Sequence, residues 1–246
     1  MTKKGKHSGK AESGAGIRDL SVKVKTAKKR KLSSTLWLQR QLNDPYVKAA
    51  QRDGYRSRAA YKLIEIDDKY GLIQPGSRII DLGAAPGGWS QIAAQRSGAV
   101  RGKGTVIAID LAAIDAIQGV EFIQCDFMDA AAPQKISQAL GEERADLVLS
   151  DMAAPATGHR QTDHLRIMGL CEAAFEFACE ILAPDGVFLA KVLQGGTEDT
   201  LLNLMKHSFK TVRHVKPKAS RADSSELYVL ATGFRGGLTT NYTNGP

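Results

Sequence analysis

The 246-residue sequence has no long apolar run. Nowhere does it carry the roughly eighteen consecutive apolar residues that a membrane-spanning helix needs. The opening segment, MTKKGKHSGKAESGAGIRDL, also lacks the apolar core of a secretory signal peptide. We therefore expect a cytoplasmic protein with no membrane partner.

Cysteine and histidine are scarce and are not spaced as metal ligands. The three cysteines form no CxxC motif, and the five histidines form no HxxxH pair and no Cys/His ligand set. This spacing disfavours both a disulfide framework and a zinc site. We expect no metal, and we expect buried, reduced thiols at Cys125, Cys171 and Cys179.

A phosphate-binding fingerprint is also missing. The run DLGAAPGGWSQ at 81–91 follows an apolar stretch, but its order from Gly83 is G-A-A-P-G-G-W rather than G-x-G-x-x-G. Pro86 removes one backbone N–H donor, and no lysine follows as it does in a P-loop. These absences disfavour a nicotinamide oxidoreductase. The glycines would instead permit close approach of an uncharged or cationic ligand, with Trp89 as an apolar wall.

The positive charge is concentrated in one segment. The formal net charge is +8, but residues 1–31 hold eleven Lys or Arg against Glu12 and Asp19. The rest of the chain, with 23 basic and 24 acidic residues, is close to neutral. A Lys-rich arm suits a polyanion such as RNA, DNA or an anionic membrane, and a solubilising extension is the alternative.

Short β-rich runs alternate with longer helical patterns from RIID at 78–81 to ELYVLAT at 226–232. This alternation predicts parallel βαβ units with right-handed crossovers and helices on both faces of one sheet. The last two runs, TVRHV and ELYVLAT, are joined by about nine residues, too few for a helical crossover. We therefore predict a Rossmann-like α/β fold, with a mostly parallel seven-stranded sheet and a closing antiparallel hairpin.

Four consecutive predicted strands end in aspartate, at Asp81, Asp110, Asp126 and Asp151. Ligands of open α/β sheets lie beyond the carboxyl ends of the strands, so we expect these side chains to converge, although any one alone is also a common loop or capping residue. Asp110 can accept both hydroxyls of a ribose, and Asp126 lies where an adenine edge would fall. Adenosine without phosphates, beside carboxylates that tolerate a sulfonium, describes S-adenosylmethionine.

From about Trp37 to Phe234 the chain resembles the FtsJ-like RNA 2′-O-ribose methyltransferases, and most closely the bacterial ones that modify a uridine of large-subunit ribosomal RNA. The segments that carry the resemblance are SRAAYKL at 57–63, DLGAAPGGWSQ at 81–91, LVLSDMAAPATGH at 147–159, FLAKVLQGG at 188–196 and SSELYVLATGF at 224–234. The resemblance implies an S-adenosylmethionine-dependent methyltransferase fold. It implies the cofactor contacts Gly83, Gly87, Gly88, Trp89, Asp110, Asp126 and Asp151.

The resemblance also implies a catalytic tetrad, which falls by motif on Lys62, Asp151, Lys191 and Glu226. A ribose 2′-hydroxyl is a poor nucleophile, so a base must take its proton while oxygen, methyl carbon and sulfur are held in line. We assign Lys191 as the proton acceptor and Asp151 as the group that orients it. Lys62 and Glu226 would position the ribose. By themselves, Lys62 could be a solvated helix residue and Glu226 a turn cap.

Basic and aromatic residues alternate before the first predicted strand. They are Arg40, Lys48, Arg52, Arg56, Arg58 and Lys62, interleaved with Trp37, Tyr46, Tyr55 and Tyr61. Such a pattern suits an RNA surface on which phosphates are neutralised and bases stack, although tyrosines at this spacing also pack a helix. A second basic edge is predicted at Lys206, Lys210, Arg213, Lys216, Lys218 and Arg221.

The resemblance implies that the substrate is a uridine of 23S ribosomal RNA in the assembled 50S subunit, and that the role is in rRNA processing and ribosome biogenesis. A transfer RNA, a messenger RNA cap and a non-catalytic ribosome-assembly factor are the alternatives. We expect a monomer. Its predicted parts are a basic, disordered arm at 1–33, one methyltransferase domain at 34–235 with an RNA-facing helical segment at 34–74, and a flexible tail at 236–246.

Overall fold

The computed structural model describes residues 23, 32–155, 157–194 and 199–236. The chain divides into two compact units, Met1–Pro45 and Tyr46–Pro246. Helix α1 (Leu32–Asn43) belongs to the first unit, and the start of the methyltransferase domain at residue 34 stays a prediction. Most of the predicted arm and tail, at 1–33 and 236–246, lies outside the described residues.

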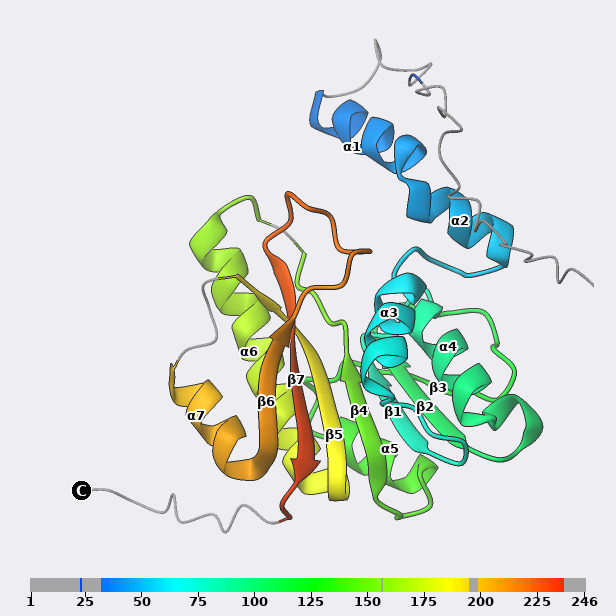
Figure 1. Ribbon diagram of the computed structural model, residues 1–246, viewed down its shortest axis with the longest axis vertical. Coiled ribbons are helices and arrows are strands. Elements are labelled where there is room, and N and C mark those ends of the chain that lie inside the picture. Colours follow the sequence, from blue (N-terminus) through cyan, green and yellow to red (C-terminus); the bar gives the residue numbers. More distant parts are fainter. Residues whose placement is uncertain (1–22, 24–31, 156, 195–198, 237–246) are drawn as a thin grey trace, which may run out of the picture. The chain divides into compact units, whose positions relative to one another are not determined.

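The second unit is built around one seven-stranded sheet with the order β3–β2–β1–β4–β5–β7–β6 (Figure 1). The strands are β1 (Arg78–Leu82), β2 (Thr105–Asp110), β3 (Glu121–Gln124), β4 (Ala145–Ser150), β5 (Leu182–Leu193), β6 (Phe209–Val215) and β7 (Glu226–Phe234). The first five pair in parallel, and β7 lies between β5 and β6, antiparallel to both. The predicted mostly parallel sheet with its closing hairpin is confirmed.

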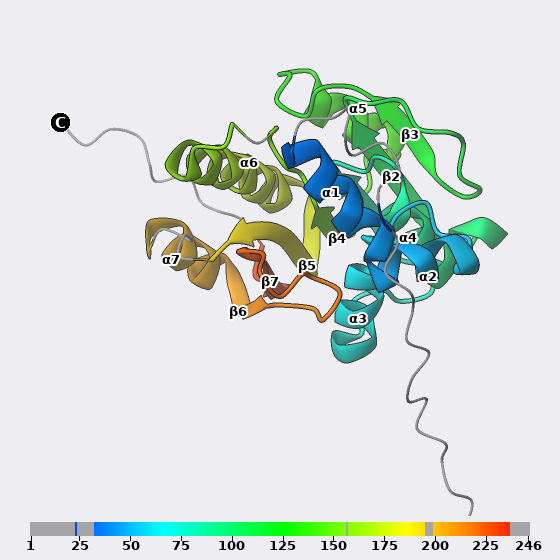
Figure 2. The same ribbon diagram turned by 90° about the horizontal axis from the view of Figure 1, so that it is seen from above.

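Helices cover both faces of this sheet (Figure 2). One face shares an apolar core with α5 (Ala132–Ala139), α6 (Arg160–Ile181) and α7 (Asp199–Ser208), and the other with α3 (Ala60–Tyr70) and α4 (Gly88–Ser97). Helix α2 (Pro45–Asp53) precedes α3, and a 3₁₀ turn, η2 (Ala99–Arg101), follows α4. In β4, Val148 packs into the first core and Leu147 and Leu149 into the second, because side chains alternate along a strand. None of the helices within the described residues combines the length and apolar content needed to cross a membrane.

The strand order changes direction between β1 and β4. From β1 the chain builds β2 and β3 on one side, whereas β4 begins the other side. Ligands of open α/β sheets bind outside the carboxyl ends of the strands at such a switch point. Because β7 is antiparallel, its first residue, Glu226, lies opposite Leu193 at the carboxyl end of β5. The start of β7 therefore reaches the same edge of the sheet as the ends of its parallel neighbours.

Candidate active site

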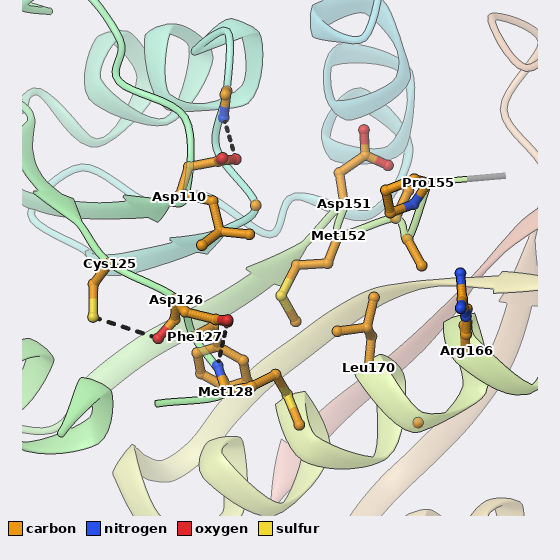
Figure 3. Close-up of a pocket in the computed structure, with 16 residues that line it drawn as sticks. Asp110, Cys125, Asp126, Phe127, Met128, Asp151, Met152, Pro155, Arg166 and Leu170 are labelled. Atoms are coloured by element: carbon orange, nitrogen blue, oxygen red, sulfur yellow. Dashed lines mark hydrogen bonds between the residues drawn. The ribbon is translucent and has the colours of Figure 1, made fainter. Parts of the chain in front are cut away.

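A cavity of about 660 Å³ opens at this edge of the sheet (Figure 3). Three of the four predicted aspartates line it: Asp110, Asp126 and Asp151. Gly83 and Met152 line it as well, and they pack so closely that a Cβ on Gly83 would lie 2.7 Å from the Met152 Cγ. Much of the remaining wall is apolar, as at Phe127, and the volume falls within the roughly 300–1,000 Å³ of cofactor sites.

Backbone groups hold Asp110 and Asp126 in place. The two carboxylate oxygens of Asp110 accept hydrogen bonds from the N–H groups of Ala85 and Ala112, each at 2.8 Å. Asp126 accepts one from the N–H of Met128 at 2.9 Å. Since an ionised carboxylate offers about four lone-pair sites, both side chains keep acceptors for the hydroxyl or amino groups of a ligand. Carboxylates between apolar walls suit an adenosine with a positive charge better than they suit a pyrophosphate.

Gly87 and Gly88 are required by packing inside the protein. A Cβ on Gly87 would lie 2.6 Å from the Ile117 Cδ1, and a Cβ on Gly88 would lie 2.5 Å from the Ser57 Oγ. Gly87 also has a φ of 105°, which favours glycine. We predicted that these glycines make room for a ligand, but Ile117 and Ser57 occupy that space. Their remaining means of contacting a cofactor is through backbone groups at the start of α4.

Trp89 is buried and does not form a wall of this cavity. It is 2% exposed, its indole N–H donates to the carbonyl oxygen of Ala59 at 2.8 Å, and its ring centroid lies 5.5 Å from that of Tyr228. The predicted role of the indole as an apolar wall is therefore corrected. The first N–H groups of a helix have no intrahelical acceptor, so the Trp89 N–H is the group with which this residue could bind a ligand.

Asp81 also points away from the cavity. As a residue within β1 it faces α4, where its carboxylate accepts a hydrogen bond from the Ser90 hydroxyl at 2.6 Å. Asp81 is fully buried, and its other carboxylate oxygen has no hydrogen-bond partner. Burial, reinforced by the negative charges of Asp151 and Asp110, raises the pKa of Asp81 to about 7. The predicted convergence thus holds for three aspartates and not for Asp81.

Asp151 joins the cavity to a cluster of charged side chains. Lys191, on β5, contacts Asp151 twice: its Nζ lies 2.8 Å from Oδ1 and donates to the Asp151 carbonyl oxygen at 2.8 Å. The parallel register that pairs Ser150 with Ala190 places these two residues side by side. Asp151 is therefore shared by the cavity and the cluster.

Lys62 and Glu226 form the second pair of the cluster. The Lys62 Nζ lies 2.7 Å from the Glu226 Oε1, and the Lys191 Nζ lies 4.0 Å from the Glu226 Oε2. The side chains of the four charged residues are only 10–17% exposed. At such burial an ion pair is screened much less than it is at the surface.

Tyr228 connects the two pairs, although no motif in the sequence marks it as a site residue. Its hydroxyl donates to the Asp151 Oδ1 at 2.7 Å and accepts from the Lys62 Nζ at 3.1 Å. It follows Glu226 by two residues, so both side chains leave β7 on the same face. A tyrosine within the apolar run LYVLA, where its hydroxyl needs a buried partner, is the signal that could have identified it.

The charges of the cluster shift the pKa values of its acidic groups in opposite directions. Burial alone would raise the pKa of Asp151, but the ammonium groups of Lys191 and Lys62 and the hydrogen bonds from Lys191 and Tyr228 outweigh it and lower that pKa. Burial, with the nearby negative charges of Asp151 and Glu226, raises the pKa of Tyr228 well above its ordinary value. Asp151 is therefore an anion and Tyr228 a neutral hydroxyl at neutral pH.

A sequence profile of the FtsJ-like methyltransferases matches residues 55–234. The chain belongs to this family. The ribosomal RNA large subunit methyltransferase E of Parvibaculum lavamentivorans is 60% identical, and the match covers 96% of this chain and 96% of the other. Its namesake from Nitrobacter hamburgensis is 64% identical over 217 residues, 88% of this chain and 95% of the other. A solved structure described as a ribosomal RNA methyltransferase from Plasmodium falciparum is 32% identical, has a TM-score of 0.65, and covers 74% of this chain and 100% of its own.

The tetrad residues of this FtsJ-like methyltransferase come from four elements that meet at one edge of the sheet. Lys62 lies on α3, Asp151 follows β4, Lys191 lies on β5 and Glu226 begins β7. The structure brings all four together, as the motif match predicted.

Two arginines that we predicted would face RNA bind the protein's own carbonyl groups. Arg56 donates to the carbonyl oxygens of Asp115 at 2.7 Å and Ala116 at 2.8 Å. Arg58 donates to the carbonyl oxygen of Ala219. Sequence composition cannot distinguish such internal contacts from phosphate contacts, because both use the same guanidinium group.

The three tyrosines of the same segment pack on one another. The ring centroid of Tyr61 lies 5.5 Å from that of Tyr46 and 5.4 Å from that of Tyr55. The Tyr61 hydroxyl donates to Asp53 at 2.5 Å, and burial together with this bond raises the pKa of Tyr61 to about 12. The helix-packing alternative is therefore correct for these rings, while the side chain of Trp37 lies outside the described part.

Part of the predicted second basic edge is also committed to internal contacts. Lys210 pairs with Asp185, and Lys216 donates to the carbonyl oxygen of Ser224 at 2.8 Å. Other members, including Lys218, are exposed. An RNA-binding role for this edge stays a prediction.

The described part of the chain contains cysteines and other potential metal ligands. Cys125, Cys171 and Cys179 are buried and unbridged, and burial raises the pKa of Cys171 to about 12 and that of Cys179 to about 11. In the part of the chain that the structure describes, no group of three or more His, Cys, Asp or Glu side chains is placed to hold a metal ion.

Proposed function

We propose that this protein transfers the methyl group of S-adenosylmethionine to the 2′-hydroxyl of a uridine in 23S ribosomal RNA, and that the assembled 50S subunit is its substrate. One observation carries the proposal: Asp151 both lines the cavity and holds the Lys191 Nζ at 2.8 Å. A donor site and a candidate proton acceptor thus share one carboxylate. The relatives named ribosomal RNA large subunit methyltransferase E support rRNA as the acceptor.

The residues around the cavity fit S-adenosylmethionine. Asp110 would hold the ribose hydroxyls and Asp126 the amino edge of adenine, since both carboxylates keep lone pairs that the backbone does not use. Gly83 lines the cavity, and the first N–H groups of α4, at Gly88 and Trp89, would be further donors if the cofactor reaches the start of that helix. When bound, the cofactor supplies an electrophilic methyl carbon on a cationic sulfur. Three carboxylates at the cavity attract such a cation.

The tetrad would supply the proton acceptor and would position the acceptor ribose. Lys191 would take the proton of the 2′-hydroxyl while the oxygen gains the methyl group and the methyl–sulfur bond of the donor breaks, which leaves S-adenosylhomocysteine. Asp151 orients the Lys191 Nζ through its two contacts. Lys62, held by Glu226 and Tyr228, donates hydrogen bonds to the oxygens of the ribose or its phosphate. Placement of the reacting atoms and proton removal are the two sources of catalysis in this scheme.

Methyl transfer to defined RNAs tests the proposal. The protein is incubated with radiolabelled S-adenosylmethionine and with 50S subunits from cells that lack the enzyme, naked 23S rRNA or tRNA, and the modified nucleoside is identified by mass spectrometry. We expect 2′-O-methyluridine in the 50S subunit. Transfer confined to tRNA would overturn the rRNA assignment. Transfer to none of these, with RNA binding intact, would favour a non-catalytic assembly factor.

The Lys191→Arg variant tests the proton acceptor. Arginine keeps the positive charge but does not give up a proton at neutral pH, so we expect turnover to fall by about 10²-fold or more, the usual range for loss of a general base. The affinity for S-adenosylhomocysteine should not change. Lys103→Arg, at an exposed site outside the cluster, is the matched control. Turnover near the wild-type rate in Lys191→Arg would refute the assignment.

We propose further that the protein acts as a monomer in the cytoplasm. Light scattering of the purified protein at micromolar concentration measures its mass directly. A stable dimer would refute the monomer, and fractionation of cells tests the location.

A further inference from the structure

The loop between β6 and β7, residues 216–225, borders the tetrad. The hydroxyl of Ser220 donates to the Glu226 Oε1 at 2.9 Å, and this same oxygen lies 2.7 Å from the Lys62 Nζ. Ala219 is 0% exposed and Ser220 is 6% exposed, although neither belongs to a strand or helix. Such deep burial in a loop requires that its backbone polar groups be satisfied by specific partners.

Arg58 and Glu65 provide those partners at Ala219. Arg58 donates to the carbonyl oxygen of Ala219, and the Ala219 N–H donates to the Glu65 Oε2 at 3.1 Å. The other oxygen of Glu65 accepts from the Tyr46 hydroxyl at 3.1 Å. Both backbone groups of one buried residue are thus bound by charged side chains, and the carboxylate that binds one of them is itself held at its second oxygen.

Arg58 and Glu65 flank Lys62 in the sequence. Arg58 lies four residues before Lys62 and Glu65 lies three residues after it, the spacings that place side chains on one face of a helix. The Lys62 N–H donates to the carbonyl oxygen of Ala59 at 3.0 Å, so the turn that carries Arg58 continues into α3. The same side of α3 therefore presents Lys62 to Glu226 and binds the backbone of the 216–225 loop.

A second, smaller cavity lies at this contact. It has a volume of about 220 Å³ and is lined by Arg58, Lys62, Arg221 and Glu226, among others. Arg221 comes from the 216–225 loop, so the position of the loop decides where this wall of the cavity lies. The loop also determines the position of the Ser220 hydroxyl, and this hydroxyl and the Lys62 Nζ both contact the Glu226 Oε1.

We propose that Arg58 and Glu65 are positioning residues for methyl transfer: by clamping Ala219 they hold the 216–225 loop so that Glu226 and Lys62 keep the geometry of the acceptor side. This inference rests on the proposed function above. It assigns Arg58 an internal role in place of the RNA contact that its basic neighbourhood predicts. Neither residue lines the 660 Å³ cavity, so the clamp acts on the acceptor side and not on donor binding.

The Glu65→Ala variant separates these roles. It removes the acceptor of the Ala219 N–H, so we expect kcat on 50S subunits to fall about tenfold, which is the effect of roughly 1.4 kcal/mol, with the KM for S-adenosylmethionine unchanged. Glu65→Gln keeps an amide oxygen that can accept this bond, and it should restore most of the activity. Glu176→Ala, at an exposed position of α6, is the matched control. Equal kcat in Glu65→Ala and wild type would overturn the proposal.

The Arg58→Ala variant distinguishes the clamp from a phosphate contact. If Arg58 acts through Ala219, kcat at saturating RNA falls by a similar factor while the dependence of RNA affinity on salt is unchanged. If it binds a phosphate, the slope of log K against log salt decreases by about 0.7–0.9 and kcat at saturation is kept. The second result would overturn the assignment of Arg58.

Hydrogen exchange follows the loop without relying on catalysis. Amides of residues 216–226 should exchange faster in Glu65→Ala than in wild type or in Glu176→Ala, because the Ala219 N–H has lost its acceptor. Unchanged exchange would overturn the clamp even if activity fell. Absence of methyl transfer by the wild-type protein in the same assay would instead refute the proposed function.

Discussion

Tyr228→Phe removes one hydroxyl from the centre of the charged cluster. The change deletes the O–H that donates to the Asp151 Oδ1 at 2.7 Å and accepts from the Lys62 Nζ at 3.1 Å. The ring itself is fully buried against Trp89, and phenylalanine keeps that packing. Asp151 and Lys62 also keep their partners, Lys191 and Glu226. The variant should therefore fold, but it lacks the hydroxyl group that links the two ion pairs through hydrogen bonds.

The size of the effect follows from the charges. A hydrogen bond to a charged group contributes roughly 1.5–3 kcal/mol, so a full loss from the transition state would lower kcat about tenfold to a hundredfold. The bond from Tyr228 is also one of the causes that lower the pKa of Asp151. Its removal should raise that pKa, and the acid side of the pH–rate profile should then move to higher pH.

Single-turnover methyl transfer on 50S subunits at saturating donor measures this rate across pH. Titration with S-adenosylhomocysteine and thermal unfolding, run in parallel, show whether donor binding and folding are kept. Tyr70→Phe, at the end of α3, is a matched control in which both rate and profile should be unchanged. A Tyr228→Phe enzyme with the wild-type rate and pH profile would mean that the tyrosine serves packing alone.

Two further changes test the strand ends beneath the donor cavity. The pKa of Asp81 is raised to about 7 in the folded protein, above its value in the unfolded chain. Between about pH 4 and 7 the folded protein therefore keeps a proton on Asp81 that the unfolded chain releases. The stability that this proton contributes is complete below about pH 4 and is lost as the pH rises through about 7. The free energy of unfolding of wild type relative to Asp81→Asn should therefore fall by up to about 1.4 kcal/mol per pH unit between about pH 4 and 7, and parallel urea-unfolding curves at all pH values would contradict this. Gly83→Ala should lower the free energy of unfolding by about 2–4 kcal/mol, because the φ of Gly83 is 76° and the new Cβ would lie 2.8 Å from the Met152 Cα. Rotation of the Met152 side chain cannot relieve this contact, because the Cα is a backbone atom. An unchanged urea midpoint would show that the ends of β1 and β4 can move apart without cost.

The fold was predictable because local pattern and connection length decide it. Alternating apolar runs and helices give the parallel sheet, and the short link from β6 to β7 allows only an antiparallel return. The aspartates show where this reasoning stops. Asp110 is the last residue of β2, whereas Asp81 precedes the last residue of β1. Because side chains alternate along a strand, the side chain of Asp81 points to the face of the sheet that α4 covers, where it binds Ser90. A one-residue difference in the end of a strand cannot be read from the sequence.

The tetrad was predictable from motifs, but the partners that hold it were not. Tyr228 binds Asp151 from 77 residues away, and Arg58 binds Ala219 from 161 residues away. Such contacts depend on how loops return to the sheet, which neither composition nor periodicity encodes. For the same reason the basic character of Arg58 was read as an RNA contact.

The antiparallel insertion of β7 ties the order of synthesis to the order in which the site is completed. Among the residues that the structure describes, those that line the 660 Å³ cavity come from the chain up to Leu170, whereas Glu226 and Tyr228 are made near its end. A chain that ends after β5 would contain the described residues that line the 660 Å³ cavity but neither Glu226 nor Tyr228. The charged cluster is therefore complete only when β7, one of the last strands to be synthesised, lies between β5 and β6.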